Sequence, residues 1–87
     1  MITRLQVRMA RTALGWGVRD LADRTGLSPT TVSRFENGHD ARMDTVRQIQ
    51  DVLERAGVIF VPGDENAGPG VRLRDPRRPA ISIEPKD

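Results

Sequence analysis

Four polar side chains recur at helical spacing within residues 26–38, a segment that reads GLSPTTVSRFENG. Their positions are i, i+3, i+4 and i+7, which places them along one side of a helix. They are Thr30, Ser33, Arg34 and Asn37. The stripe carries hydrogen-bond donors and acceptors but no carboxylate. In the major groove of DNA, arginine pairs bidentately with guanine, while Thr and Ser bind base edges or a thymine methyl group. A merely solvated helix face is the alternative.

The segment that presents this stripe has the marks of a helix at both ends. Ser28 is a favourable N-cap residue, Pro29 suits the first helical position, and Asn37 followed by Gly38 ends the segment. Val32 and Phe35 are the only large apolar residues inside it, on the side opposite the polar stripe. We therefore predict a helix over residues 29–37 with one buried and one available face.

Three more helices are predicted from apolar residues at helical spacing, over residues 3–14, 18–25 and 43–56. The helices at 18–25 and 29–37 are joined by a tight turn at Gly26, and Ala22 is small where the two helices would cross. Two short helices joined in this way form a helix-turn-helix unit. Thr25 fits this pattern least well, because an apolar residue is more usual at its position.

The chain changes character after Gly57. Residues 58–61 are apolar on both faces and predict a central strand, and residues 71–74 and 80–84 alternate as half-buried strands do. The chain therefore divides into a helical unit, 1–57, and a β-rich tail, 58–87, which we expect to be a dimerisation element. A lone hairpin is marginal in water, so we expect strands of two subunits to pair. The residues expected at this interface are Val58, Ile59, Phe60, Val61, Val71 and Leu73. A hairpin folded back on its own helix, in a monomer, is the alternative.

Composition limits the classes of function open to this chain. It has 87 residues and no cysteine, which excludes disulfides and thiolate metal sites. Its net charge is only +2 despite a high isoelectric point, because arginine supplies nearly all the positive charge, so net charge alone does not indicate nucleic-acid binding. Without a signal peptide or an apolar run of about 20 residues, we expect a cytoplasmic protein that does not enter a membrane.

Enzymatic chemistry is not expected from these residues. No nucleophile elbow or phosphate-binding glycine loop occurs. The single histidine, His39, lies beside Asp40 but lacks further ligands at metal-binding spacing, so we expect a solvated loop histidine, no metal and no cofactor.

Residues 4–56 resemble the Cro and lambda-repressor-like helix-turn-helix family of bacterial and phage regulators, also called the xenobiotic-response-element family. The segments that carry the resemblance are LGW at 14–16, VRDLA at 18–22, GLS at 26–28, VSRFENG at 32–38 and DTV at 44–46. The resemblance implies a mainly α fold, with a four-helix DNA-binding domain here followed by a short C-terminal β-hairpin. It also implies a homodimer that places two recognition helices in successive major grooves.

The resemblance assigns roles by position. Base contacts fall to Pro29, Thr30, Ser33 and Arg34. Phosphate contacts fall to Val18, Arg19, Thr31, Asn37 and Arg42, either through side chains or through backbone amides. Arg11 matches a family arginine that pairs with the glutamate at Glu36 and braces the first helix against the third; a DNA contact by Arg11 is the alternative. One departure is at Gly17 and Val18, where family members have a Ser or Thr cap followed by a phosphate-gripping Gln.

Together these observations predict a sequence-specific regulator of transcription that binds double-stranded DNA, in the form of a repressor acting as a homodimer with residues 29–37 in the major groove. Two alternatives stay open. The chain could be the antitoxin of a toxin–antitoxin pair, with a tail that binds the toxin, and a toxin-like reading frame beside the gene would favour this. It could also be a protein-interaction module without DNA binding, in which Arg34→Ala would leave every activity intact.

Overall fold

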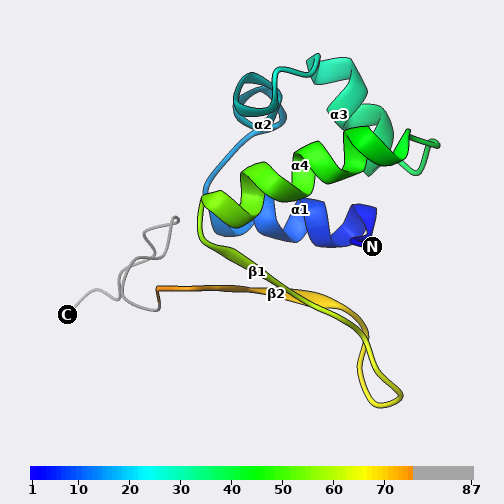
Figure 1. Ribbon diagram of the computed structural model, residues 1–87, viewed down its shortest axis with the longest axis vertical. Helices are drawn as coiled ribbons and strands as arrows, with labels where there is room; N and C mark the ends of the chain where they lie inside the picture. Colours follow the sequence, from blue (N-terminus) through cyan, green and yellow to red (C-terminus); the bar gives the residue numbers. More distant parts are fainter. Residues whose placement is uncertain (76–87) are drawn as a thin grey trace.

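The computed structural model describes residues 1–75, so the strand expected near residues 80–84 lies outside the described part (Figure 1). Four helices are followed by a two-stranded antiparallel sheet, which confirms the expected fold class. The helices are α1 (Arg4–Ala13), α2 (Val18–Thr25), α3 (Pro29–Glu36) and α4 (Met43–Arg55). The strands are β1 (Val58–Val61) and β2 (Gly70–Leu73), and β2 begins one residue earlier than the alternation of its sequence predicts.

Capping groups explain why the helices begin where they do. At α1, the Thr3 hydroxyl accepts from the Gln6 amide at 3.1 Å, and the Gln6 side chain accepts from the Thr3 amide at 2.9 Å, a reciprocal capping box. At α3, the Ser28 hydroxyl accepts from the Thr31 amide at 3.0 Å. These side chains satisfy amides that the first helical turn leaves without partners.

One hydrophobic core joins the helices to the sheet. Its largest fully buried side chains are Leu21, Ile49, Leu53, Val7, Val32 and Val58. They come from all four helices and from β1, so the helices and the hairpin share one core. In Figure 1 the hairpin lies along one side of the helices, and its loop extends beyond them.

Thr25, the poorest match to the helix-turn-helix pattern, is buried at 5% exposure and is fully satisfied. Its hydroxyl lies 2.8 Å from the Leu21 carbonyl oxygen and accepts a hydrogen bond from the Leu27 amide at 3.3 Å. Its own carbonyl accepts from the Gln48 side chain at 2.6 Å. A polar residue is tolerated here because every polar atom it buries has a partner.

The hairpin has one covered and one outward face. In its register, Val58 pairs with Leu73 and Phe60 with Val71, and these four side chains pack against the core. Ile59 pairs with Arg72 on the other face, where Ile59 is 39% exposed. Within residues 1–75 the sheet has two strands, so β1 has one neighbour there, and the expectation of a central strand at residues 58–61 stays a prediction. The apolar residues on the covered face of β1 pack against the helices.

Gln6 attaches the hairpin to α1. Its side-chain amide donates to the carbonyl oxygens of Val61 at 3.1 Å and Gly70 at 2.9 Å, at the end of β1 and the start of β2. The residue is 3% exposed, so these bonds form largely out of water. One side chain thus caps a helix and holds both strands.

We expect Gln6→Ala to lower the free energy of unfolding by about 1–3 kcal/mol, because it removes two buried hydrogen bonds to the strand carbonyls and half of the capping box. Urea denaturation measures the change. Gln50→Ala is the matched control, since Gln50 donates only to the nearby Glu54 side chain, and it should cost less than about 0.5 kcal/mol. Equal losses in the two variants would contradict the role given to Gln6.

Candidate nucleic-acid interface

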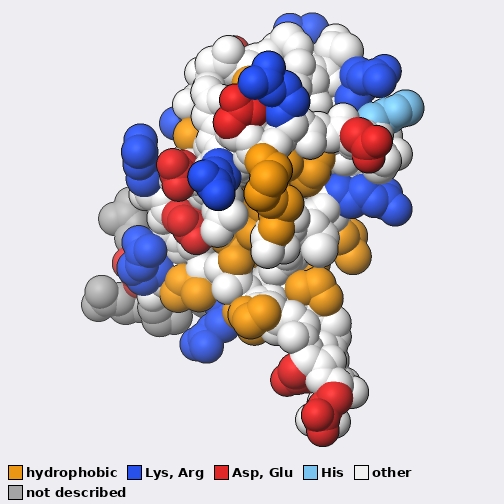
Figure 2. All heavy atoms as spheres, turned by 45° about the vertical axis from the view of Figure 1, so that its right-hand side comes forward, with side chains coloured by type: hydrophobic (Ala, Val, Ile, Leu, Met, Phe, Trp, Pro, Cys, Tyr) orange, Lys and Arg blue, Asp and Glu red, His pale blue; other side chains and the backbone are white. Residues whose placement is uncertain are grey.

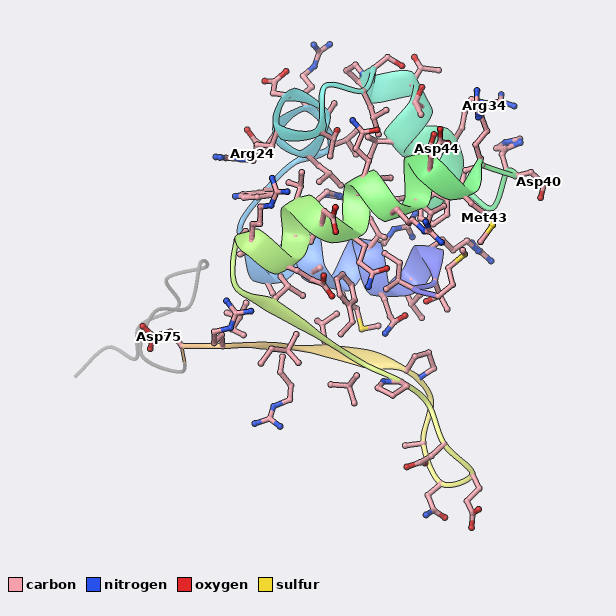
Figure 3. The ribbon with its side chains drawn as sticks, in the orientation of Figure 1. Arg24, Arg34, Asp40, Met43, Asp44 and Asp75 are labelled. Carbon is pink, nitrogen blue, oxygen red and sulfur yellow. The ribbon has the colours of Figure 1, made fainter. Side chains whose placement is uncertain are left out.

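The outer face of α3 exposes most of the polar stripe found in the sequence. Pro29, Thr30, Arg34 and Asn37 are exposed, whereas Ser33 is half-buried. Thr31 is also half-buried, and its hydroxyl lies 2.8 Å from that of Ser28, so it takes part in the helix cap. Figure 3 shows Arg34 extending outward from α3 beside the loop that carries Asp40. The side chains best placed to meet a ligand are therefore those of Thr30, Arg34 and Asn37.

The turn between α2 and α3 fixes the direction in which this face points. Gly26 adopts φ +76°, a left-handed conformation that side chains on other residues rarely allow. Ala22 and Val32 are fully buried where the two helices pack. Because α3 has only eight residues, its orientation depends on this packing rather than on intrinsic helix stability.

A buried ion pair fixes the other end of α3. The Arg11 Nε and Nη2 atoms each lie 2.8 Å from one carboxylate oxygen of Glu36, a bidentate arrangement. Glu36 is only 3% exposed, and the Arg11 Nη1 atom also donates to the Trp16 carbonyl at 3.0 Å. The hydrogen bond with Glu36 raises the pKa of Arg11 above its ordinary value, although burial acts to lower it. Arg11 therefore stays charged, and its hydrogen bonds to Glu36 hold α1 against α3.

Comparison with known proteins agrees with this geometry. A model of the helix-turn-helix family matches residues 7–56, from the second turn of α1 to the end of α4. This chain belongs to the Cro-type helix-turn-helix family. It is also 35% identical over 48 residues to a protein of Archaeoglobus fulgidus whose provisional name is HTH-type transcriptional regulatory protein. The match covers 55% of this chain but only 16% of that relative's length.

Two of the positions expected to contact phosphate, Val18 and Arg19, lie at the start of α2. The Gly17 amide, at the N-cap, donates to the Asp20 carboxylate at 2.7 Å, so this backbone group is already engaged within the chain. Val18 is half-buried and packs against the core, which leaves its backbone but not its side chain available. Arg19 is exposed. Of these positions, Arg19 is the one whose side chain is free to reach outward.

Arg42, at the N-cap of α4, has an acidic neighbour that sequence spacing did not reveal. Its Nη2 atom lies 3.3 Å from the Asp44 carboxylate, and the two side chains are 84% and 71% exposed. Ion pairs this exposed contribute little to stability. The Arg42 side chain can therefore exchange Asp44 for another anion at small cost.

Trp16 lies in the turn between α1 and α2 and has a structural role. It is half-buried against the core, and the Arg24 guanidinium lies over its ring, 4.3 Å from the centroid. A cation in this position is attracted to the negative face of the indole. This contact ties the last turn of α2 to the turn that precedes the helix.

Neither a metal cluster nor a membrane-spanning helix occurs within residues 1–75. No group of three or more His, Asp or Glu side chains in this range is arranged to hold a metal ion. None of the helices in the same range has the length and apolar character needed to cross a membrane.

We expect Arg11→Ala to lower the free energy of unfolding by about 3–5 kcal/mol, because it removes both of the short hydrogen bonds that pair the buried Glu36 carboxylate. Arg8→Ala is the matched control: Arg8 lies 3.6 Å from the same carboxylate but is 51% exposed, so its loss should cost less than about 1 kcal/mol. Thermal and urea unfolding measure both. The double variant Arg11→Met with Glu36→Met should be more stable than Arg11→Ala, and the opposite order would contradict this account.

Proposed function

We propose that this chain is a sequence-specific regulator of transcription that binds double-stranded DNA with α3 in the major groove. The observation that carries the proposal is the exposed, carboxylate-free stripe of Thr30, Arg34 and Asn37 on a helix held at both ends, by the Gly26 turn and by the Arg11–Glu36 pair. An α-helix fits the width of the major groove, and this stripe supplies the donors and acceptors that base edges require.

Base and phosphate contacts divide along the surface. Pro29, Thr30 and Arg34 are exposed toward the base edges, with the half-buried Ser33 behind them. Asn37, Arg19 and Arg42 are exposed at the margins of this surface, where phosphates would lie. Val18 would act through its backbone amide at the start of α2, where amides favour anions. The Thr31 amide already donates to Ser28, so Thr31 would act through its half-buried hydroxyl. We propose repression as the outcome, in which the bound protein would occupy DNA that the polymerase needs.

We also propose that two copies associate through the hairpin. Its covered face is used within the chain, because Val58, Phe60, Val71 and Leu73 pack on the core. Its outer face keeps Ile59 exposed and Val61 half-buried, and both strands of the described sheet have an unpaired edge. Strand edges pair readily with a second chain, and a twofold axis would present two α3 helices to successive grooves.

The first test titrates DNA from the gene's own upstream region with wild-type protein and Arg34→Ala by fluorescence anisotropy at physiological salt. We expect Arg34→Ala to lose about 1–3 kcal/mol of binding free energy on the preferred site, because a bidentate base contact disappears. Competition with bulk DNA should weaken the wild type far less than the variant.

Arg55→Ala is the matched control, because Arg55 is exposed at the C-terminal end of α4, away from the face that α3 presents. It should bind the preferred site as the wild type does. If Arg34→Ala and Arg55→Ala bind alike, or if the wild type does not prefer any site over bulk DNA, the proposed function is wrong.

Ile59→Glu tests self-association. We expect it to shift the protein from dimer to monomer in sedimentation equilibrium, because it places a charge on the outer face of the hairpin, while thermal stability changes little for an exposed position. Arg72→Glu alters charge at the paired position without removing an apolar side chain and serves as a comparison. A wild type that sediments as a monomer at every concentration would refute the dimer.

A further inference from the structure

Three arginines follow one face of α1. Arg4, Arg8 and Arg11 stand at positions i, i+4 and i+7, so they line up along the helix. Arg11 is committed to Glu36 through two hydrogen bonds. Arg8 makes only a 3.6 Å contact with the same carboxylate and is half-exposed. Since one carboxylate faces two guanidinium groups, this end of the helix keeps an excess positive charge.

Arg4 reaches the turn that follows α3. A Cβ atom built on Gly38 would lie 3.6 Å from the Cζ and Nε atoms of Arg4, so the guanidinium lies against the turn at ordinary contact distance. Gly38 adopts φ +93° and directly follows Asn37, the last residue of the exposed stripe. Within residues 1–75, Arg4 has no carboxylate within ion-pair distance. The arginine row of α1 is thus continuous with the outer face of α3.

A surface hollow of about 330 Å³ lies beside this row. It is lined by Thr3, Arg4, Leu5, Arg8, Glu36 and Pro69. Glu36 is the only acidic residue among them, and its charge is already balanced by Arg11. The hollow therefore presents two cations with available charge, in a space large enough for a phosphate group.

The charges around the turn favour an anion on this side of the molecule. Figure 2 shows arginine side chains on both sides of the pale-blue histidine, with one acidic side chain next to it. Asp40 is the exposed acidic residue of the loop between α3 and α4, and the Asp44 carboxylate forms an ion pair with Arg42. The acidic residues Asp64 and Glu65 belong to the far hairpin loop, at the opposite end of the face in Figure 2. The strand of DNA that passes the C-terminus of α3 would therefore meet these arginine side chains and not the acidic hairpin loop.

We propose that Arg4 and Arg8 bind the phosphate backbone of DNA next to the turn after α3, as a second row of contacts supplied by α1. The proposal rests on the proposed function, because DNA that holds α3 in its major groove must place its phosphate backbone beside Gly38. Arg8 can turn to a phosphate at little cost, since Glu36 keeps its bidentate partner. Contacts of this kind set affinity and register but carry no sequence information.

The test measures the dependence of DNA affinity on salt for wild type, Arg4→Gln, Arg8→Gln and the double variant, on the preferred site and on bulk DNA. Each phosphate contact that is lost should reduce the slope of log K against log salt by about 0.9 in magnitude. The factor by which affinity falls between 50 and 200 mM salt should then be about threefold smaller in each single variant than in the wild type. The effect should be equal on both DNAs, which leaves the preference for the site unchanged. Arg4→Lys should keep the wild-type slope, because a lysine also neutralises a phosphate.

Two controls distinguish a lost phosphate contact from unfolding and from the loss of a positive charge at a distant position. Thermal unfolding shows that each variant is folded, and Arg55→Gln should leave the slope unchanged because that arginine is at the far end of α4. If folded Arg4→Gln and Arg8→Gln keep the wild-type slope while Arg34→Ala still loses the site, the α1 contacts are refuted and the proposed function stands. If the wild type shows no preferred site, the proposed function fails. The salt slopes of Arg4→Gln and Arg8→Gln on bulk DNA then still show whether α1 contacts phosphate: a reduced slope supports the contacts and an unchanged slope refutes them. A wild type that binds no DNA refutes both.

Discussion

The orientation of the exposed face of α3 depends on the pairing of the buried Glu36 carboxylate. A charge buried to this extent is tolerated only with a partner of matching geometry, and the Arg11 guanidinium provides two hydrogen bonds to it. The same guanidinium holds the Trp16 carbonyl, so one side chain joins α1, the following turn and the end of α3. Because the eight-residue α3 could not persist as a helix in isolation, its exposed face exists in one orientation only through such contacts.

The remaining polar groups of the interior follow the same rule. Thr25 bonds the surrounding backbone beside the α2–α3 turn, where its carbonyl also accepts from the exposed Gln48, and Gln6 is bonded between α1 and the hairpin. No buried side-chain nitrogen or oxygen in residues 1–75 lacks a hydrogen-bond partner. In a core this small, polar residues of fixed geometry define the angles between elements, while apolar side chains supply most of the stability.

Charge placement matters more than net charge. The chain carries only two more basic than acidic side chains, yet Glu36 and Asp20 are paired within the chain, and Asp64 and Glu65 stand on the distant hairpin loop. The arginines of α1 and α3 remain at the opposite end. A weakly charged protein can therefore present a local positive surface, and such surfaces govern electrostatic attraction within about 10 Å at moderate salt.

Local sequence determined the helices, the Gly26 turn, the polar stripe of α3 and the existence of a hairpin, because caps, glycines and apolar periodicity act over a few residues. The resemblance of residues 4–56 to the helix-turn-helix family pointed to Arg11 and Glu36 as partners. Tertiary structure alone decided that Arg4 lies against Gly38, that Gln6 holds both strands, and that one face of β1 is covered by helices. These contacts join residues 34 to 64 positions apart, and no local preference encodes them. They follow from the way the shared core packs, which is a property of the whole chain.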